Sequence, residues 1–591
     1  MPSSPGASMP SGRPLSAVSI NLSGGLMSTR FFTQHKRSLI AVATLALIAS
    51  SAMAAPKDSY LEYDGGPQFL GADDGLGGQK PSVGMAGATL GGWAAAPANG
   101  APSSIGLAFK GVSQYDLRAI LGGSFIPPDT MGAVGATQFM ETTNGVYAIY
   151  NKVTGAVESK VDARVFWQAA GMNDGSGLNG DARVLFDKPS QKWIAIQFGA
   201  SVADIQIAVS TTSNALGPWR STKFTGFAGG TADYPTLAID SKAIYIGTNN
   251  FNGANAFSGT TLNVIARSDL LGAAAPTVAS LKQFNTSLAG GVERGFAIQG
   301  VNSTGADAGR VVAAALYTND SIRYSVINPG TAGATLTPVT QLGLTNYANN
   351  NNPARQPDGN RNIDPSDQRI GSNAWEQNGK IYFVYTATAV GGDRTEVRWV
   401  VTNAATNAVI QEGVIGDNTH DFYQGSLTVN SSGQVVIGYN RSGFSAADGN
   451  VSFLARSFNS DAAGKLVQTN ELLLHVSPVN DYHNGSGQGA AAVGRQRWGD
   501  YSAVTLDPND DQSFWAIGQY AELWNNAAGC GAVVPAIPGC NLGGGSSWGT
   551  WIAEIKLDVV GAVPEPETYA LMFGGLLAMA AVVRRKRAAL V

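Results

Sequence analysis

The sequence predicts an all-β fold, a β-propeller of seven blades, with six blades as the alternative. One observation is a recurring unit, in which an Asp precedes an apolar strand, a polar turn and a second apolar strand. The copies start about 50–80 residues apart and each holds three or four short strands, as propeller blades require. The other observation is that no convincing amphipathic helix of ten or more residues interrupts them. A signal helix and a short hydrophobic helix are expected only at the two ends.

Seven copies of the unit can be placed along the chain. Their starts are Asp129, Asp181, Asp233, about Gly295, Asp367, Asp421 and Asp500. The fourth copy is degenerate, with Arg294 in the place of Asp. The fifth is expected to open with a strand over Asp367–Ile370. Because an open propeller would leave unpaired strand edges, we expect closure by a strand from around Leu107 to Ile120, beside the strand that ends near Leu557.

The beginning of the chain has the three parts of a secretory signal. Arg30, Lys36 and Arg37 form the charged start, and Leu39–Ile48 is the apolar core. Ala52 and Ala54 form an A-x-A cleavage site that leaves Ala55 as the mature start. Residues 1–26 precede this signal, so Met27 is the expected true start.

The predicted organisation therefore has four parts. They are an upstream extension with signal peptide (1–54), a flexible Gly/Ala/Pro-rich lead-in (55–110), the propeller (111–560) and a sorting tail (563–588). Charged residues make up 14% of the chain and the net charge is −4, so no basic surface for nucleic acid is expected. Cys530 and Cys540 flank a short Gly/Pro loop, and in an exported protein they predict a local disulfide.

The end of the chain has the composition of a sorting segment. It contains the motif Val563, Pro564, Glu565 and Pro566, an apolar run over 569–583, and the basic residues Arg584, Arg585, Lys586 and Arg587. The run is shorter than the roughly 20 residues of an ordinary span, and the basic residues should stay cytoplasmic. A plain C-terminal membrane anchor is the alternative.

This tail resembles the PEP-CTERM signal of exported Gram-negative proteins. The resemblance implies cleavage by an exosortase near the Pro-Glu-Pro motif, with transient inner-membrane anchoring followed by cell-surface or extracellular display. The expected partners are then the exosortase, the secretion machinery, and an exopolysaccharide or another surface protein of a biofilm matrix.

Three phrases of the body resemble secreted bacterial propellers that are structurally akin to sialidases. They are Asp181–Trp193, Ala232–Pro235 and Arg497–Tyr501. The resemblance implies a fold and little about activity, because propellers carry many unrelated functions.

The repeated Asp residues have two interpretations. Asp side chains cap turns by accepting backbone N–H groups, which is a structural role. Placed on one ring by the repeat, they could also bind a cation or act as acid and base. A weak Ca²⁺ candidate is Asp174, Asn179 and Asp181, in an oxygen-rich loop without the EF-hand spacing; no other cofactor or metal is expected.

Several arginines fall near blade starts. The tentative ligand-binding residues are Arg183, Arg294, Arg369 and Arg497, with Asp181 and Asp367. Converging arginines would suit a uronate or sialate, whereas arginines paired with blade Asp residues would stabilise the blades. Tyr234, Tyr423 and Tyr501 have no convincing Glu partner, as a sialidase would need, and no catalytic residue is assigned. The sequence therefore favours a binding propeller over the alternative, a secreted glycan-active hydrolase.

Overall fold

The computed structural model describes residues 63–64, 102–173, 180–253, 256–287, 293–306, 308–347, 353–357, 361–389, 392–479, 482, 494–524 and 546–557. These residues belong to one compact unit, Tyr60–Val591. The predicted signal peptide with its Ala52–Ala55 cleavage site, the two cysteines and the sorting tail lie outside the described residues.

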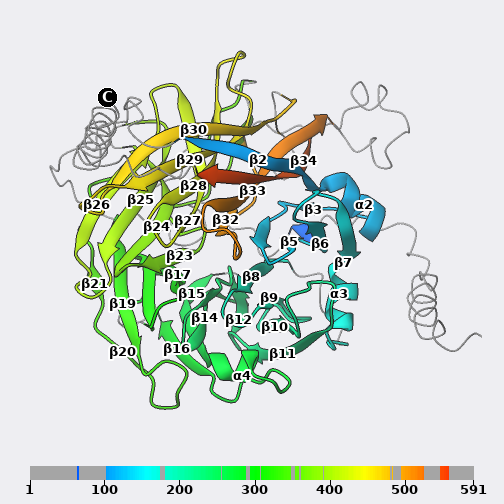
Figure 1. Ribbon diagram of the computed structural model, residues 1–591, viewed down its shortest axis with the longest axis vertical. Helices are drawn as coiled ribbons and strands as arrows, with labels where there is room; N and C mark the ends of the chain where they lie inside the picture. Colours follow the sequence, from blue (N-terminus) through cyan, green and yellow to red (C-terminus); the bar gives the residue numbers. More distant parts are fainter. Residues whose placement is uncertain are drawn as a thin grey trace, which may run out of the picture. The chain divides into compact units, whose positions relative to one another are not determined.

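Seven groups of mainly antiparallel strands follow one another along the described chain and form the blades of a β-propeller (Figure 1). Blade one contains β4 (Met131–Val134), β5 (Gln138–Thr143), β6 (Val146–Asn151) and β7 (Val157–Asp162). Blade two contains β8 (Arg183–Asp187), β9 (Lys192–Phe198), β10 (Asp204–Ser210) and β11 (Trp219–Thr225). Blade three contains β12 (Gly230–Asp233), β13 (Ala238–Ile239), β14 (Ala243–Asn252), β15 (Phe257–Ala266) and β16 (Lys282–Ser287).

The remaining blades repeat the antiparallel pattern. Blade four contains β17 (Phe296–Ser303), β18 (Arg310–Ala314), β19 (Ser321–Ile327), β20 (Thr335–Leu336) and β21 (Thr340–Gln341). Blade five contains β23 (Ala374–Gln377), β24 (Lys380–Thr388), β25 (Thr395–Asn403) and β26 (Val409–Ile415). Blade six contains β27 (His420–Val429), β28 (Val435–Gly443), β29 (Ser452–Ser460) and β30 (Leu466–Val476). Blade seven contains β32 (Ala503–Leu506), β33 (Ser513–Trp524), β34 (Ser546–Leu557) and β2 (Ser103–Ser113).

A few elements lie outside this pattern. They are the parallel pairs β1 (Tyr63–Asp64) with β3 (Phe125–Ile126) and β22 (Arg361–Ile363) with β31 (Gly494–Gln496), and the helices α2 (Gln114–Leu121), α3 (Ala163–Ala169) and α4 (Arg267–Leu271). Blades four and five also share a short parallel contact between β17 and β23, which joins them into one continuous sheet.

The strand β2 closes the ring, because it pairs antiparallel with β34 from Ser103 opposite Leu557 to Ser113 opposite Gly549. Closure from the N-terminal side was predicted, but two details were wrong. The strand begins at Ser103, inside the segment expected to be lead-in. It ends where Ser113 caps α2 through a capping box with Asp116, so residues 114–121 are helical and not extended.

Buried apolar side chains fill the space between successive blades. Residues of successive blades belong to the same buried clusters, as do Met140 and Trp193, Ile194 and Ile244, Tyr245 and Val311, Val312 and Phe383, Val384 and Ile437, Phe453 and Phe514, and Trp515 and Phe139. Each fully buried aliphatic or aromatic side chain contributes about 1.5–3 kcal/mol of transfer free energy. Because neighbouring blades cover both faces of the inner strands, strands such as β9 and β24 have almost continuous apolar sequences, whereas the outer strands β7 and β11 are polar and partly exposed.

The two faces of the ring differ in the length of their connections. We call the face on which the first strand of each blade begins the start face. Since the strands alternate in direction, the connections between second and third strands, and those between blades, also lie there. The start face carries the described parts of the connections 163–182, 342–373 and 477–502, whereas most turns of the opposite face are as short as 135–137, 188–191 and 378–379. Long loops on a rigid scaffold are where propellers present binding residues.

Candidate functional site

The starts of the inner strands bring four carboxyl groups together on the start face. Asp129, Asp181 and Asp500 each precede the first strand of a blade, and Asp233 is the last residue of β12. Asp129 accepts the backbone N–H of Asp500 at 2.8 Å and the side-chain amide of Asn144 at 2.7 Å. The carbonyl oxygen of the same Asn144 amide accepts the backbone N–H of Asp181 at 2.9 Å. Blades seven, one and two are therefore joined by hydrogen bonds at their starts.

Burial and mutual repulsion change the acidity of these groups. Burial first, and then the charge of Asp500, raise the pKa of Asp129 to about 6 and that of Asp233 to about 7. Burial and the carboxylates of Asp233 and Asp129 raise the pKa of Asp181 well above its ordinary value. The positive charge of Arg497 opposes the pKa shift of Asp129, and those of Arg369 and then Arg497 oppose the pKa shift of Asp233. With a pKa of about 7, Asp233 is therefore partly protonated at neutral pH.

Two arginines and two tyrosines pack against the carboxyl groups. Arg369 binds Asp367 at 2.7 Å and lies 3.5 Å from Asp500. The guanidinium of Arg183 stacks 3.6 Å from the ring centre of Tyr501, whose hydroxyl donates to Asp181 at 2.9 Å. We call this set the central cluster; it comprises Asp129, Asp181, Asp233, Asp367, Asp500, Arg183, Arg369, Arg497, Tyr234 and Tyr501.

One part of the central cluster is buried, and another part is accessible to solvent. Arg183 and Tyr234 are each 1% exposed, so they lie within the protein. The side chains of Asp367 and Asp500 are 25% and 23% exposed, so solvent reaches the cluster there. A ligand on the start face would meet Asp367 and Asp500 first, together with the arginine between them, Arg369.

The structure brings together five of the six residues predicted to bind a ligand. Arg183, Arg369, Arg497, Asp181 and Asp367 belong to the central cluster. Arg294 does not join these contacts; its guanidinium lies 5.7 Å from the ring of Tyr324 in blade four. The predicted strand Asp367–Ile370 is wrong, because the Asp367 carboxylate accepts the backbone N–H of Arg369 at 2.9 Å and turns the chain.

Sequence reasoning missed two contributors to the site, Asn144 and Gly371. Asn144 is followed by Gly145, a dipeptide that signals a hairpin turn, but nothing in that pattern indicates that its amide joins two blades. Gly371 lies beside Tyr234 in the connection 342–373. Of the weak Ca²⁺ candidates, Asp174 and Asn179 lie outside the described residues, and the described Asp181 accepts the hydroxyl of Tyr501.

The long connections of the start face are fixed to one another near the cluster. β22 pairs with β31, which links connection 342–373 to connection 477–502. The side-chain amide of Gln356 binds both backbone groups of Tyr482, at 2.6 and 2.9 Å. Ala354, Ile363 and Tyr482 are fully buried in the same apolar cluster as Tyr234 and Tyr501. Parts of both connections are therefore packed into the protein.

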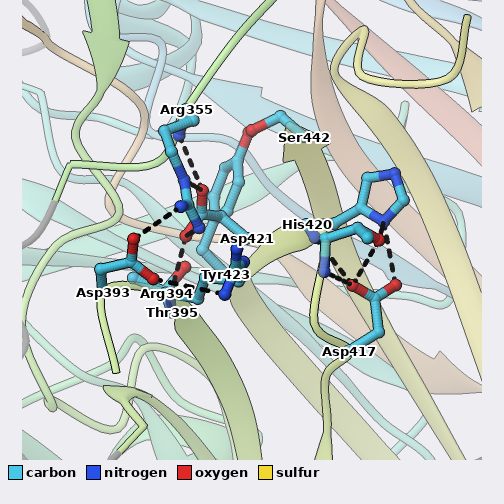
Figure 2. A network of polar contacts seen from close by, with 10 residues as sticks. Arg355, Asp393, Arg394, Thr395, Asp417, His420, Asp421, Tyr423 and Ser442 are labelled. Carbon is cyan, nitrogen blue, oxygen red and sulfur yellow. Dashed lines mark hydrogen bonds and ion pairs between the residues drawn. The ribbon is translucent and has the colours of Figure 1, made fainter. Parts of the chain in front are cut away.

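A second polar network joins connection 342–373 to blade six, and Figure 2 shows Arg355 reaching Asp421 on one side and Asp393 on the other. Arg355 binds the buried Asp421 at 2.7 and 3.1 Å, and its own backbone N–H donates to the same carboxylate at 2.9 Å. Beside it, His420 Nδ1 lies 2.9 Å from Asp417. The contacts of Arg355 hold connection 342–373 against blade six. They give Asp421 a structural role, which is one of the two interpretations of the repeated Asp residues.

Within the described parts of the chain, no group of His, Cys, Asp and Glu side chains has an arrangement suited to holding a metal ion. No helix among the same residues is both long enough and apolar enough to cross a membrane.

Comparisons with known proteins give structural likenesses alone. No protein-family model and no curated protein matches the sequence. A protein of unknown function from Dyadobacter fermentans is 9% identical, with 73% of this chain and 94% of that chain aligned and a TM-score of 0.32. An exo-1,5-α-L-arabinanase from a bovine ruminal metagenomic library is 9% identical (58% and 96% covered, TM-score 0.28). The extracellular domains 1–2 of Drosophila semaphorin 1b are 8% identical (79% and 89% covered, TM-score 0.32).

Proposed function

We propose that this chain is an exported propeller that binds a glycan on its start face without cleaving it. The observation that carries the proposal is the solvent-accessible side of the central cluster. There, Asp367 and Asp500 flank Arg369 on the start face. Alternating carboxylates and guanidinium groups offer acceptors and donors at fixed spacing. Such an array suits a ligand that is rich in hydroxyl groups, which both donate and accept.

The existing ion pairs of Arg369 favour a neutral glycan over an anionic one. The central cluster holds five carboxyl groups and three guanidinium groups, and Arg369 is already paired with Asp367 and Asp500. A uronate or sialate carboxylate would have to compete with these aspartates for the same donors. A hydroxyl group can bind beside the existing pairs without breaking them.

Exposed aromatic rings on the same face support a sugar ligand. Tyr317, between β18 and β19, is 53% exposed, and Phe444, between β28 and β29, is 54% exposed. Both belong to connections of the start face. Aromatic rings can cover the apolar C–H faces of sugar rings, whereas their exposure to water alone is unfavourable.

A hydrolase that acts on glycans is the second candidate, and one observation favours it. The pKa of Asp233 is raised to about 7 by burial and by the nearby Asp500, which is itself partly exposed. A carboxyl group with a raised pKa near a second carboxyl group is the combination that acid and base catalysis of glycoside cleavage uses. Against this candidate, Asp233 is 8% exposed, so the acid has little access to a substrate.

The binding proposal predicts that Asp500→Asn weakens glycan binding about tenfold or more, because a charged hydrogen-bond acceptor becomes neutral. The experiment is a glycan array of the mature protein (residues 55–560), followed by titration calorimetry on each glycan that binds. The matched control is Asp510→Asn, an exposed Asp on the opposite face, which should bind like the wild type. Equal binding by both variants, or no glycan bound by the wild type, would contradict the proposal.

A fluorogenic glycoside panel, run on the same protein, separates the two candidates. Turnover that falls as the pH rises through about 7, and that is lost in Asp233→Asn, would establish the hydrolase and overturn the binding proposal. Saturable binding without turnover is the result that we expect.

We further propose that the chain is exported through its N-terminal signal and sorted by an exosortase at the Pro-Glu-Pro motif. What supports this is the order of motif, apolar run and basic residues at the end of the sequence. Mass spectrometry of the protein from an exosortase-containing host should find a mature C-terminus near Pro564–Pro566. Replacing Pro564, Glu565 and Pro566 by Ala should retain residues 569–591 at the inner membrane, whereas Glu567→Ala should not. An unprocessed wild-type tail would favour a plain membrane anchor.

A further inference from the structure

Two hydrogen-bond donors inside the central cluster are left without acceptors. Neither Nη2 of Arg183 nor the hydroxyl of Tyr234 has a hydrogen-bond partner among the described residues, and both atoms are buried. Each of the two side chains is 1% exposed. An unpaired buried donor is unfavourable, so two of them in neighbouring residues require an explanation.

The rest of the Arg183 side chain is held firmly. Its Nε donates to the carbonyl oxygen of Pro235 at 3.0 Å, and its Nη1 lies 3.5 Å from the carbonyl oxygen of Gly371. Its guanidinium also stacks on Tyr501. These contacts fix the orientation of the group, so Nη2 cannot turn to another acceptor without breaking them.

Tyr234 is held just as firmly, and it shares a neighbour with Arg183. The guanidinium groups of Arg183 and Arg369 lie 5.3 Å and 4.6 Å from the centre of its ring. A methyl group added at Gly371 would lie 3.5 Å from the Tyr234 hydroxyl and 3.5 Å from the carbonyl oxygen of Asp500, both ordinary contact distances. A methyl side chain at Gly371 would therefore contact the hydroxyl without a clash.

Gly371, which lies beside the Tyr234 hydroxyl, is also close to the solvent-accessible side of the central cluster. The residue itself is partly exposed. Its neighbour Asp500 is 23% exposed and lies 3.5 Å from Arg369. To reach the two unpaired donors, a small substituent of a ligand bound at Asp367 and Asp500 would have to enter beside Gly371, where the chain carries no side chain.

We propose that the two unpaired donors, Nη2 of Arg183 and the hydroxyl of Tyr234, bind an uncharged carbonyl oxygen of the ligand. The glycan recognised by the start face would then carry acyl groups. The inference rests on the proposed function. A carbonyl oxygen has two lone pairs and no hydrogen, so it can accept from Arg183 and from Tyr234 at once. A hydroxyl group would need a further acceptor for its own hydrogen. An anionic carboxylate would add a further negative charge beside the carboxyl groups of Asp181, Asp233 and Asp500, whose burial and mutual repulsion already raise the pKa values of Asp181 and Asp233.

The test uses two substitutions that act at this place and one matched control. Tyr234→Phe removes the unpaired hydroxyl, and Gly371→Ala fills the space beside it. The control is Tyr245→Phe, which removes a buried hydroxyl that does have a partner, the carboxylate of Asp240 at 2.5 Å. Thermal unfolding is measured without ligand. Affinity is measured for chitotetraose and for cellotetraose. Chitotetraose carries an acetamido group on each sugar where cellotetraose carries a hydroxyl group.

We expect the wild type to prefer chitotetraose about tenfold or more. Tyr234→Phe and Gly371→Ala should both abolish that preference, with unfolding midpoints that are unchanged or higher. Tyr245→Phe should lower the midpoint by several degrees and keep the preference.

Failure of this inference can be distinguished from failure of the proposed function. If cellotetraose and other neutral glycans bind as well as acylated ones, the start face binds glycans and the acyl inference is wrong. If Tyr234→Phe lowers the midpoint as much as Tyr245→Phe does, the hydroxyl has a structural partner and the inference is again wrong. If no glycan of any kind binds, the proposed function itself fails.

Discussion

Deletion of β2 (Ser103–Ser113) is expected to prevent the chain from folding. The strand supplies the fourth position of blade seven and joins the ends of the described chain by pairing with β34. It also makes contacts beyond that pairing. Asn470 of blade six binds both backbone groups of Ser103, at 2.8 and 2.9 Å, and Glu141 of blade one accepts the backbone N–H of Val112 at 3.0 Å.

The expected loss is comparable to the whole stability of a domain. The deletion removes the backbone hydrogen bonds of a long strand, at about 1 kcal/mol each, together with the burial of Val112. It also leaves the buried Glu141 without one of its donors. Domains are stable by only about 5–15 kcal/mol, so a sum near 10 kcal/mol should leave little native protein. The measurement is the near-ultraviolet circular dichroism and the urea unfolding curve of the purified variant.

A circular permutation provides the control for this deletion. Because Ser103 lies opposite Leu557, residues 103–113 can be moved to follow Leu557 through a short Gly-rich turn. The permuted chain should regain the native spectrum, since the same strand pairs with the same neighbour. A deletion variant that unfolds at the wild-type urea midpoint would show that β2 is not needed for ring closure.

Arg355→Met is expected to lower the free energy of unfolding by about 3–5 kcal/mol, because it leaves the carboxylate of Asp421 buried without its cation. Asp421 is fully buried, and besides the side chain of Arg355 it accepts the backbone N–H of Thr395 at 2.9 Å. Met keeps the length of the side chain and removes the charge and the donors. Urea unfolding followed by fluorescence measures the loss.

Two further variants show whether the buried pair is responsible. Asp393→Asn breaks the other ion pair of Arg355, but Asp393 is 72% exposed, so it should cost less than about 1 kcal/mol. Adding Asp421→Asn to Arg355→Met should recover part of the loss, because no charge is then left buried. A loss below about 1 kcal/mol for Arg355→Met alone would mean that water or another residue replaces the guanidinium.

The blade pattern was accessible to sequence reasoning because it is local. An apolar strand, a short turn and a second apolar strand can be read from neighbouring residues such as Val184–Phe186 and Trp193–Ile196, and the structure has β8 and β9 there. The prediction failed where a side chain competes with the strand. Asp367 accepts a backbone N–H two residues later, so the chain turns at Arg369, and β23 begins only at Ala374.

The residue content of the site was also partly predictable. Repetition places equivalent residues on one ring, so Asp181, Arg183, Arg369 and Arg497 can be grouped by their positions in the repeat alone. Arg294 is grouped by the same argument and lies against Tyr324 instead, because blade four begins without the Asp of the other blades. Repetition indicates which positions correspond, and it does not indicate which side chains contact one another.

By itself, the sequence determined that this protein is a propeller whose ring is closed by its N-terminal strand, and which polar residues stand at the blade starts. These properties follow from hydrophobic alternation and turn residues, which act over a few positions. Only the tertiary structure decided that Tyr501 donates to Asp181, that Asp233 has a raised pKa, and that Arg183 and Tyr234 are buried with unpaired donors. Burial, charge coupling and unpaired donors depend on residues from other blades, and only folding brings those residues together.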